Sequence, residues 1–274
     1  MAETNARITG DFNWRMPKTI PSFIEGADAK AIYDGVKQFG GVWYDETSKV
    51  VKGSNIPIVA RIDTELRGLG LRVANLADLS RPEVMEMVRG RYYSDTPALI
   101  LRSIEDSHAP NRAIISQLVP VVEQRQGTLK LPVIINGFDA VSSEGGEGYK
   151  WTIVPRDDFS VIQDERLDGK YNGARFSDVD ELGLPKFDKG GSRTFYARNQ
   201  GISRLYLDRY LDLNSYNEYL AYSDEVGRVV VVSGEAAGEN FARQYANKLK
   251  AEQDARKNAL DKWFERSMAD MPGK

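Results

Sequence analysis

The chain of 274 residues contains no cysteine and only one histidine, His108. Without cysteine it can form no disulfide, no thiolate zinc site and no cysteine nucleophile, so we expect packing alone to hold the fold. A zinc site with one histidine would need mostly carboxylate ligands, which is rare. A Ser-His-Asp triad would need His108 and a G-x-S-x-G elbow, and the sequence has no such elbow. We therefore interpret His108 as a capping or surface residue and expect no catalytic site and no cofactor.

The chain also lacks long apolar runs and a strong charge of either sign. No run of 18 apolar residues exists, so we expect no membrane span. The net charge of −3 disfavours nucleic acid as a partner, because a nucleic-acid surface would be basic. The first ten residues, MAETNARITG, do not resemble a secretory signal. The location stays open between the cytoplasm, as the default, and export or association with a virion by another route.

What the sequence does contain is a stretch with two alternating faces, LYLDRYLDLN at residues 205–214. Leucine stands at the odd positions except 209, and Tyr, Asp and Asn stand at the even ones. A period of two predicts a strand with leucine on its inner face and polar side chains on its outer face. The expected inward frame is Leu205, Leu207, Leu211, Leu213 and Leu220, with the valines of 229–232 as a central buried strand.

Tyrosine is unusually frequent in and after this stretch, with five tyrosines between positions 206 and 222. A buried tyrosine needs a hydrogen-bond partner for its hydroxyl, so cores favour Leu, Ile, Val and Phe instead. Tyr mixed with Asn, Ser and Asp is typical of antibody-like binding surfaces, where Tyr gives rigid contact area and Ser and Asn give adaptable hydrogen bonds. A solvated strand and turn is the competing interpretation, and composition alone does not separate the two.

The run RNQGISRLYLDRYLDLNSYNEYLAYSDEVGRVVVV, residues 198–232, resembles the variable region of diversity-generating retroelement target proteins. In that family an error-prone reverse transcriptase rewrites template adenines, so that Asn codons become Tyr, Asp, Ser and other codons. The resemblance implies a C-type lectin-like fold of the formylglycine-generating-enzyme type, no enzymatic activity, and an exposed set of rewritten side chains that binds an unknown protein or cell-surface ligand. We call this the contact set: Tyr206, Asp208, Tyr210, Asp212, Asn214, Tyr216, Asn217, Tyr219 and Tyr222.

Two residues of the run depart from the family pattern. Adenine changes cannot convert an Asn codon into a Glu codon, so Glu218 and Glu225 stay outside the contact set. The resemblance covers residues 198–232 directly, and the preceding hundred or so residues are only compatible with the fold. Formylglycine-generating enzymes share that fold, but their oxidation chemistry uses cysteine, which this chain lacks.

An acidic segment at residues 164–188 carries an alternative function, a hydrolase or nuclease that uses a divalent metal. Its Asp178-x-Asp180-x-x-Gly183 opens like a calcium loop but places Leu182 where a ligand is needed. A structural Ca²⁺ stays open, although we expect most of the acids to be solvated turn residues and commit to no metal site. The acids are Asp164, Glu165, Asp168, Asp178, Asp180, Glu181 and Asp188. A third hypothesis is a viral structural or assembly protein whose Tyr-rich strand forms a homo-oligomer interface.

The order of apolar periods and turn signals predicts an α+β protein. The expected domains are an N-terminal segment at 1–95, a C-type lectin-like domain at 96–235 with variable region 198–232, and a C-terminal helix at 236–274. Helices are expected at 28–39, 80–88, 111–126 and 238–266, with Asp28, Ser80 and Asn111 as caps of the first three and a kink or break at Pro120. Strands or hairpins are expected at 42–51, 56–62, 97–101, 132–138, 149–154 and 159–162. Residues 1–25 are expected to form an extended arm, 142–148 a flexible loop and 164–191 a long ordered loop or hairpin.

Overall fold

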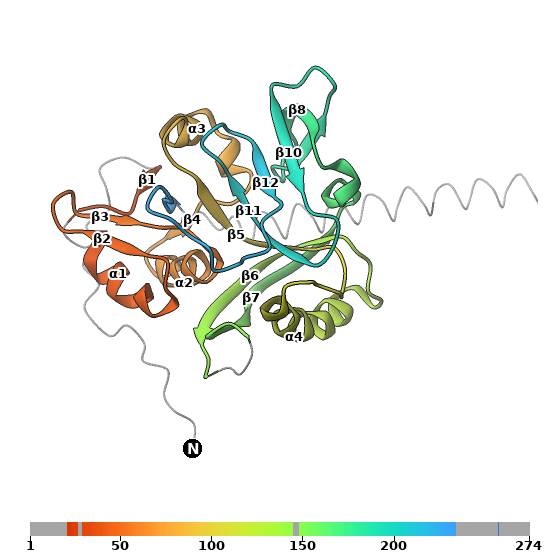
Figure 1. The fold of residues 1–274 in the computed structure, drawn as a ribbon, viewed down its shortest axis with the longest axis horizontal. Helices are drawn as coiled ribbons and strands as arrows, with labels where there is room; N and C mark the ends of the chain where they lie inside the picture. The colour runs from red at the N-terminus through yellow and green to blue at the C-terminus, as the bar shows by residue number, and fades with distance from the viewer. Residues whose placement is uncertain (1–20, 27–28, 145–147, 234–256, 258–274) are drawn as a thin grey trace, which may run out of the picture. The chain divides into compact units, whose positions relative to one another are not determined.

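Most strands of this α+β protein join one large sheet, flanked by helices and two smaller sheets (Figure 1). The computed structural model describes residues 21–26, 29–144, 148–233 and 257. Four sequence-based expectations therefore fall wholly or largely outside the described residues: the arm over residues 1–20, the cap at Asp28, the middle of the 142–148 loop, and the 238–266 helix apart from Lys257.

The large sheet has eight strands in the order β7-β6-β5-β11-β12-β10-β8-β9. Neighbouring strands are antiparallel except β10 and β12, which are parallel. The strands are β5 (Ser94–Leu101), β6 (Val133–Ser142), β7 (Trp151–Gln163), β8 (Ala174–Val179), β9 (Pro185–Phe187), β10 (Arg193–Ala197), β11 (Ile202–Leu207) and β12 (Leu213–Ser215).

Two smaller sheets and four α-helices complete the described fold. A three-stranded sheet places β13 (Val230–Ser233) between β1 (Ser22–Phe23) and β4 (Leu71–Val73), so the valine run is a central buried strand as expected. β2 (Trp43–Asp45) and β3 (Val50–Lys52) form the expected hairpin. The helices are α1 (Ala29–Val36), α2 (Ile56–Arg67), α3 (Pro82–Val88) and α4 (Ala109–Gln126), with 3-10 turns η1 (Lys37–Phe39), η2 (Asp78–Ser80), η3 (Glu165–Leu167) and η4 (Gly169–Tyr171).

The main core joins the N-terminal segment, the large sheet and the variable region. Its buried side chains include Ile56 of α2, Leu99 of β5, Ile114 of α4 and Ile135 of β6. Leu220, from the loop between β12 and β13, lies in the same cluster and is fully buried. Residues on both sides of the expected boundary at 95/96 thus share one core, and residues 21–233 belong to one compact unit.

The expected strand at 56–62 is wrong, because these residues begin α2. Asn55 caps the helix by accepting the Ile58 N–H at 3.1 Å, and Pro57 stands in the first turn, where its missing N–H costs nothing. Residues 56–60 are all buried. A short, continuous apolar run of this kind does not distinguish a strand from a buried helix by periodicity.

The expected strand at 205–214 is two strands joined by a turn. β11 ends at Leu207, β12 begins at Leu213, and these two leucines are cross-strand partners with buried side chains. Leu211 also faces the core, but from the turn, with a left-handed backbone at φ 69°. The leucine frame is therefore buried as expected, although the strand that we expected to carry it is interrupted.

Helix caps also differ from expectation. The N-cap positions of α3 and α4 are Arg81 and His108, and neither side chain makes a capping hydrogen bond. Asn111, the expected cap of α4, is buried and donates its amide to Asp106 at 3.0 Å. The Ser80 hydroxyl, the expected cap of α3, instead donates to the Leu76 carbonyl at 3.4 Å.

The remaining elements agree more closely. α1 with η1 covers the expected 28–39 helix, and β5 and β6 contain the expected strands. α4 runs through Pro120 as one helix instead of splitting. The two strands expected at 149–154 and 159–162 are one long strand, β7. The segment 164–191 holds η3, η4 and the β8–β9 hairpin.

Candidate ligand-binding surface

A row of side chains runs across four neighbouring strands at the centre of the large sheet. Tyr206 of β11 pairs with Asp95 of β5 on one side and with Asn214 of β12 on the other, and Asn214 pairs with Tyr196 of β10. Directly opposed residues share a face of the sheet. Asp95 is buried, Tyr206 and Asn214 are half-buried, and Tyr196 is exposed. The row therefore becomes progressively more open to solvent from β5 towards β10.

The turn between β11 and β12 is shaped by two members of the contact set. The Asp208 carboxylate accepts the N–H groups of Tyr210 at 2.8 Å and Asp212 at 3.0 Å. Asp212 accepts the Thr194 N–H at 2.6 Å and so ties the turn to β10. Burial raises the pKa of Asp208 above its ordinary value, while these N–H donors act in the opposite direction. Both aspartates thus have a structural task besides any contact with a ligand.

None of the nine contact-set side chains is buried. Tyr210, Tyr216, Tyr219 and Tyr222 are 69, 60, 52 and 51% exposed, and the other five are half-buried. Tyrosine rings are seldom left this open to solvent in a group. The structure therefore buries the leucine frame and exposes four of the five tyrosines, of which only Tyr210 belongs to the alternating stretch 205–214.

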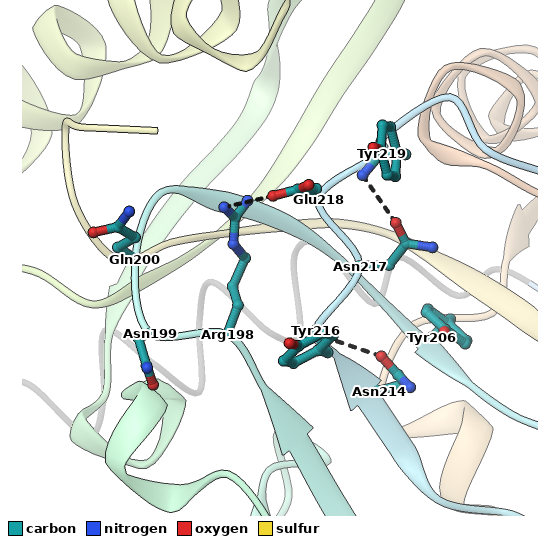
Figure 2. A pocket seen from close by; sticks show the side chains of 9 residues that line it. All are labelled: Arg198, Asn199, Gln200, Tyr206, Asn214, Tyr216, Asn217, Glu218 and Tyr219. Carbon is teal, nitrogen blue, oxygen red and sulfur yellow. Dashed lines mark hydrogen bonds and ion pairs between the residues drawn. The ribbon is translucent and has the colours of Figure 1, made fainter. Parts of the chain in front are cut away.

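Five members of the contact set line one pocket of about 740 Å³: Tyr206, Asn214, Tyr216, Asn217 and Tyr219 (Figure 2). The volume lies within the range of pockets that hold small ligands. Two short turns give the wall its shape, because Asn214 accepts the Tyr216 N–H at 3.0 Å and Asn217 accepts the Tyr219 N–H at 2.9 Å. The other four members lie outside the pocket lining: Asp208, Tyr210, Asp212 and Tyr222.

Four further residues line this pocket that the sequence reasoning did not place there: Arg198, Asn199, Gln200 and Glu218. The first three form the turn between β10 and β11 (Figure 2). Asn199 could have been predicted from the sequence, because it lies inside the run 198–232 and Asn is one of the residue types of the contact set. Arg198 could not, because its partner Asp106 is 92 residues away in the sequence.

Two of the lining residues, Arg198 and Glu218, form an ion-pair cluster with the buried Asp106, and we call these three residues the floor of the pocket. The Arg198 guanidinium donates to Asp106 at 3.1 and 3.2 Å. It also donates to Glu218 Oε2 at 2.9 Å (Figure 2). Asp106 is fully used, since it also accepts from the Ile202 N–H and the Asn111 amide. A Cβ on Gly201 would lie 2.1 Å from the Asp106 carboxylate, so only glycine fits at that position.

We call residues 205–227, from β11 to the loop before β13, the display segment. The part of this segment that follows β12 is held mainly through its backbone. Asn111 donates to the Glu218 carbonyl at 3.1 Å, the Tyr149 hydroxyl accepts the Leu220 N–H at 3.1 Å, and Asn55 donates to the Ala221 carbonyl at 3.0 Å. The Ile56 N–H donates to the Leu220 carbonyl at 3.1 Å, and the Gly53 N–H donates to the Gly227 carbonyl at 2.8 Å. None of these donors and acceptors belongs to the contact set.

Arg204 is a further buried anchor. Its guanidinium donates to the Tyr222 carbonyl, lies 3.4 Å from Asp95, and stacks 4.4 Å from the centre of the Tyr206 ring. Tyr93 lies edge-on to Tyr206 with ring centres 5.6 Å apart. Burial raises the pKa of Asp95, and the Arg204 charge opposes that shift. Tyr206 is therefore packed against Arg204 and Tyr93 and is half-buried, unlike the four exposed tyrosines.

A second buried arginine, Arg102, links three strands of the large sheet. Arg102, which directly follows β5, donates to the hydroxyls of Ser203 on β11 and Ser215 on β12, both at 2.8 Å, and the two hydroxyls lie 2.9 Å apart. Burial lowers the pKa of Arg102, and the nearby Arg198 charge lowers it further. These bonds fix the strands from which the display segment begins.

The acidic segment 164–188 uses most of its carboxylates in turns and ion pairs. Arg166 bridges Asp164 at 2.6 Å and Asp180 at 2.7 Å, and Lys186 pairs with Asp178 at 2.9 Å. Asp168 and Asp188 accept backbone N–H groups of their own turns. Within the described residues, no three His, Cys, Asp or Glu side chains come together as a metal site. The metal-dependent alternative therefore gains no candidate site from the described part of the chain.

The described part of the chain also contains no helix with the length and apolarity that crossing a membrane requires. Comparisons of the whole chain with protein-family models, with curated proteins and with solved structures find no match.

Proposed function

We propose that this protein is a non-enzymatic binding protein of the diversity-generating retroelement type, which displays its contact set on a C-type lectin-like fold to a protein or cell-surface ligand. The observation that supports this most directly is the separation of tasks in the display segment. Residues outside the contact set hold the backbone at 218–221, while seven of the nine contact-set side chains are exposed or line the pocket, all but Asp208 and Asp212.

This separation matches what a variable binding surface needs. Backbone that is held independently of the exposed side chains keeps its conformation when those side chains change. It also spares the ligand the cost of ordering a loose loop on binding. Clustered tyrosines are effective contacts, since interface hot spots are enriched in Tyr and contribute about 2 kcal/mol or more each.

A display library tests the proposal. Six contact-set codons are varied among Tyr, Asp, Asn and Ser, while Tyr206, Asp208 and Asp212, which also support the fold, are kept, and the library is selected against several unrelated purified proteins. We expect binders to several targets, with thermal melting temperatures close to that of the parent. A matched library varies exposed positions on α4, which face solvent but lie outside the proposed surface: Arg112, Ala113, Ser116, Gln117, Glu123 and Gln124.

Equal yields of binders from the two libraries, or loss of folding in most contact-set variants, would contradict the proposal. The retroelement origin has a separate test in the surrounding DNA. We expect a reverse transcriptase gene and a near-copy of the stretch that encodes residues 198–232, with differences concentrated at adenines.

A further inference from the structure

The charge around the pocket points to the chemistry of the partner. Arg198 neutralises only one of the two carboxylates that it contacts, Asp106 and Glu218. The nearby Arg102 has its own counter-charge in Asp168. Arg112 reaches the Asp106 backbone carbonyl, at 3.4 Å, and its side chain is exposed to solvent. These three carboxylates and three arginines balance in number, but only Arg198 and Glu218 line the pocket.

Glu218 is the most accessible charge of the pocket floor. Its Oε2 atom binds Arg198, while Oε1 accepts no hydrogen bond from the described residues. The side chain is 33% accessible, compared with 9% for Arg198 and none for Asp106. A ligand that enters the pocket therefore meets the Glu218 carboxylate before it meets Arg198 or Asp106.

The walls of the pocket add aromatic rings suited to a cation. Tyr206, Tyr216 and Tyr219 line it, and the face of a tyrosine ring attracts an ammonium or guanidinium group. Tyr206 already stacks on Arg204, and Tyr219 packs edge-on to His108 with ring centres 4.6 Å apart. Tyr216 makes no ring contact within the described part of the chain and is 60% exposed, so its face is open to a ligand.

The display segment has a negative net charge. The display segment carries five acidic side chains and one arginine, Arg209. Charge complementarity of this kind selects partners and speeds their association. Resting on the proposed binding function, we propose that the pocket takes a lysine or arginine side chain of a basic protein partner, with Glu218 as the charged contact and Tyr216 as the ring beside it.

The test uses short capped peptides as probes of the full chain. Amide NMR spectra are recorded during titration with acetyl-GKGKG-amide, with the glutamine and glutamate peptides of the same length, and with triacetylchitotriose as a neutral sugar. We expect the lysine peptide to shift pocket amides and to bind about tenfold more tightly than the glutamine peptide. Added salt should weaken its binding, because exposed charges are screened.

Two matched variants locate the effect. Glu218→Gln keeps an acceptor for Arg198 and should remove most of the lysine preference. Glu225→Gln makes the same change of net charge at an exposed position outside the pocket lining and should leave the preference nearly unchanged. Unshifted amides elsewhere in the spectrum show that each variant is folded.

Three results would overturn the inference: no shift of pocket amides with the lysine peptide, binding of the glutamine peptide or the sugar at equal affinity, or equal losses in the two variants. Binding of a neutral probe in the pocket would leave the proposed binding function standing. If the contact-set library yields no binders but the lysine preference persists, the proposed variable surface is refuted and the lysine-binding pocket still stands.

Discussion

Tyrosines of the contact set occupy two different environments. Tyr210 stands at the tip of the β11–β12 turn, where Arg209 approaches its ring at 5.0 Å. Tyr206 lies between Arg204 and Tyr93, and burial raises the pKa of its hydroxyl. A change at Tyr210 removes exposed area, whereas a change at Tyr206 also uncovers a buried guanidinium. The alternation in the sequence treats the two residues alike, and only the packing distinguishes them.

Substitution on the two faces of the display segment should have very different costs. Leu207→Ala removes a fully buried side chain and should lower the free energy of unfolding by about 2–5 kcal/mol. Tyr210→Ala should change it by no more than about 0.5 kcal/mol, as for an ordinary surface position. Urea denaturation of both variants measures the difference. Comparable losses would mean that Tyr210 is packed in solution.

The leucine frame could be predicted from the sequence, because the period of side chains depends only on neighbouring residues. The ion pair in the pocket floor could not, because nothing local in the sequence relates Arg198 to Asp106 or Asn111 to Glu218. Such pairs are decided by the register of strands and by the packing of α4. The contact set was accordingly placed on the surface, while the floor beneath it was missed.

At the scale of elements, α2 links the core to the display segment. Its cap residue, Asn55, accepts the Ile58 N–H with its oxygen and donates its amide to the Ala221 carbonyl. One side chain thus begins a helix and holds a loop that lies 166 positions later in the chain. The strand expected at 56–62 overlooked this cap, although Asn before Ile-Pro is a recognisable helix start.

Two substitutions at Asn55 should separate its two tasks. Asn55→Ala loses the cap and leaves a buried carbonyl unpaired, so we expect a cost of about 2–4 kcal/mol in the free energy of unfolding. Asn55→Ser keeps a good capping oxygen but is too short for the Ala221 carbonyl, so it should recover about 1 kcal/mol. Hydrogen exchange at residues 220–222 should be faster than in the parent for both. Parent-like exchange in both variants would show that Asn55 does not hold the display segment.

At the scale of the whole described unit, charged and aromatic groups join the N-terminal elements to the large sheet. Arg61 of α2 pairs with Asp139 of β6 at 2.7 Å, and Arg156 of β7 pairs with Asp63 of α2 at 2.8 Å. Tyr93 donates its hydroxyl to the Ser54 carbonyl and accepts the Asp224 N–H. Such cross-links are invisible to periodicity, which is why the sequence suggested a boundary near residue 95 where the core is continuous.

Alkaline pH should weaken this unit through its buried tyrosines. Burial, aided by the Asp95 charge, raises the pKa of Tyr93 to about 12, while an unfolded tyrosine ionises near pH 10. Between these values the unfolded chain loses the proton and the folded chain keeps it, so the free energy of unfolding falls as pH rises. Tyr93 alone should lower the free energy of unfolding by roughly 2–3 kcal/mol across this pH range, at 1.36 kcal/mol per pKa unit. Tyr149 and Tyr206 act in the same direction, since burial raises the pKa of each.

Urea denaturation at several pH values from 9 to 12 measures this dependence. The fall should be shallower in Tyr93→Phe, which removes one titrating group. Tyr216→Phe, at an exposed position, should keep the slope of the parent. Identical slopes in all three proteins would show that Tyr93 ionises as readily when folded as when unfolded.

The supports of the display segment are encoded mainly far from the stretch that they support. Gly53, Asn55, Tyr93, Asn111 and Tyr149 all precede residue 198, and each bonds to the display segment. A single short tract of the gene can therefore be overwritten without altering the codons of these supporting residues. Under the proposed function, these five supports are inherited through one part of the coding sequence and binding specificity through another, so a lineage could exchange the second while it keeps the first.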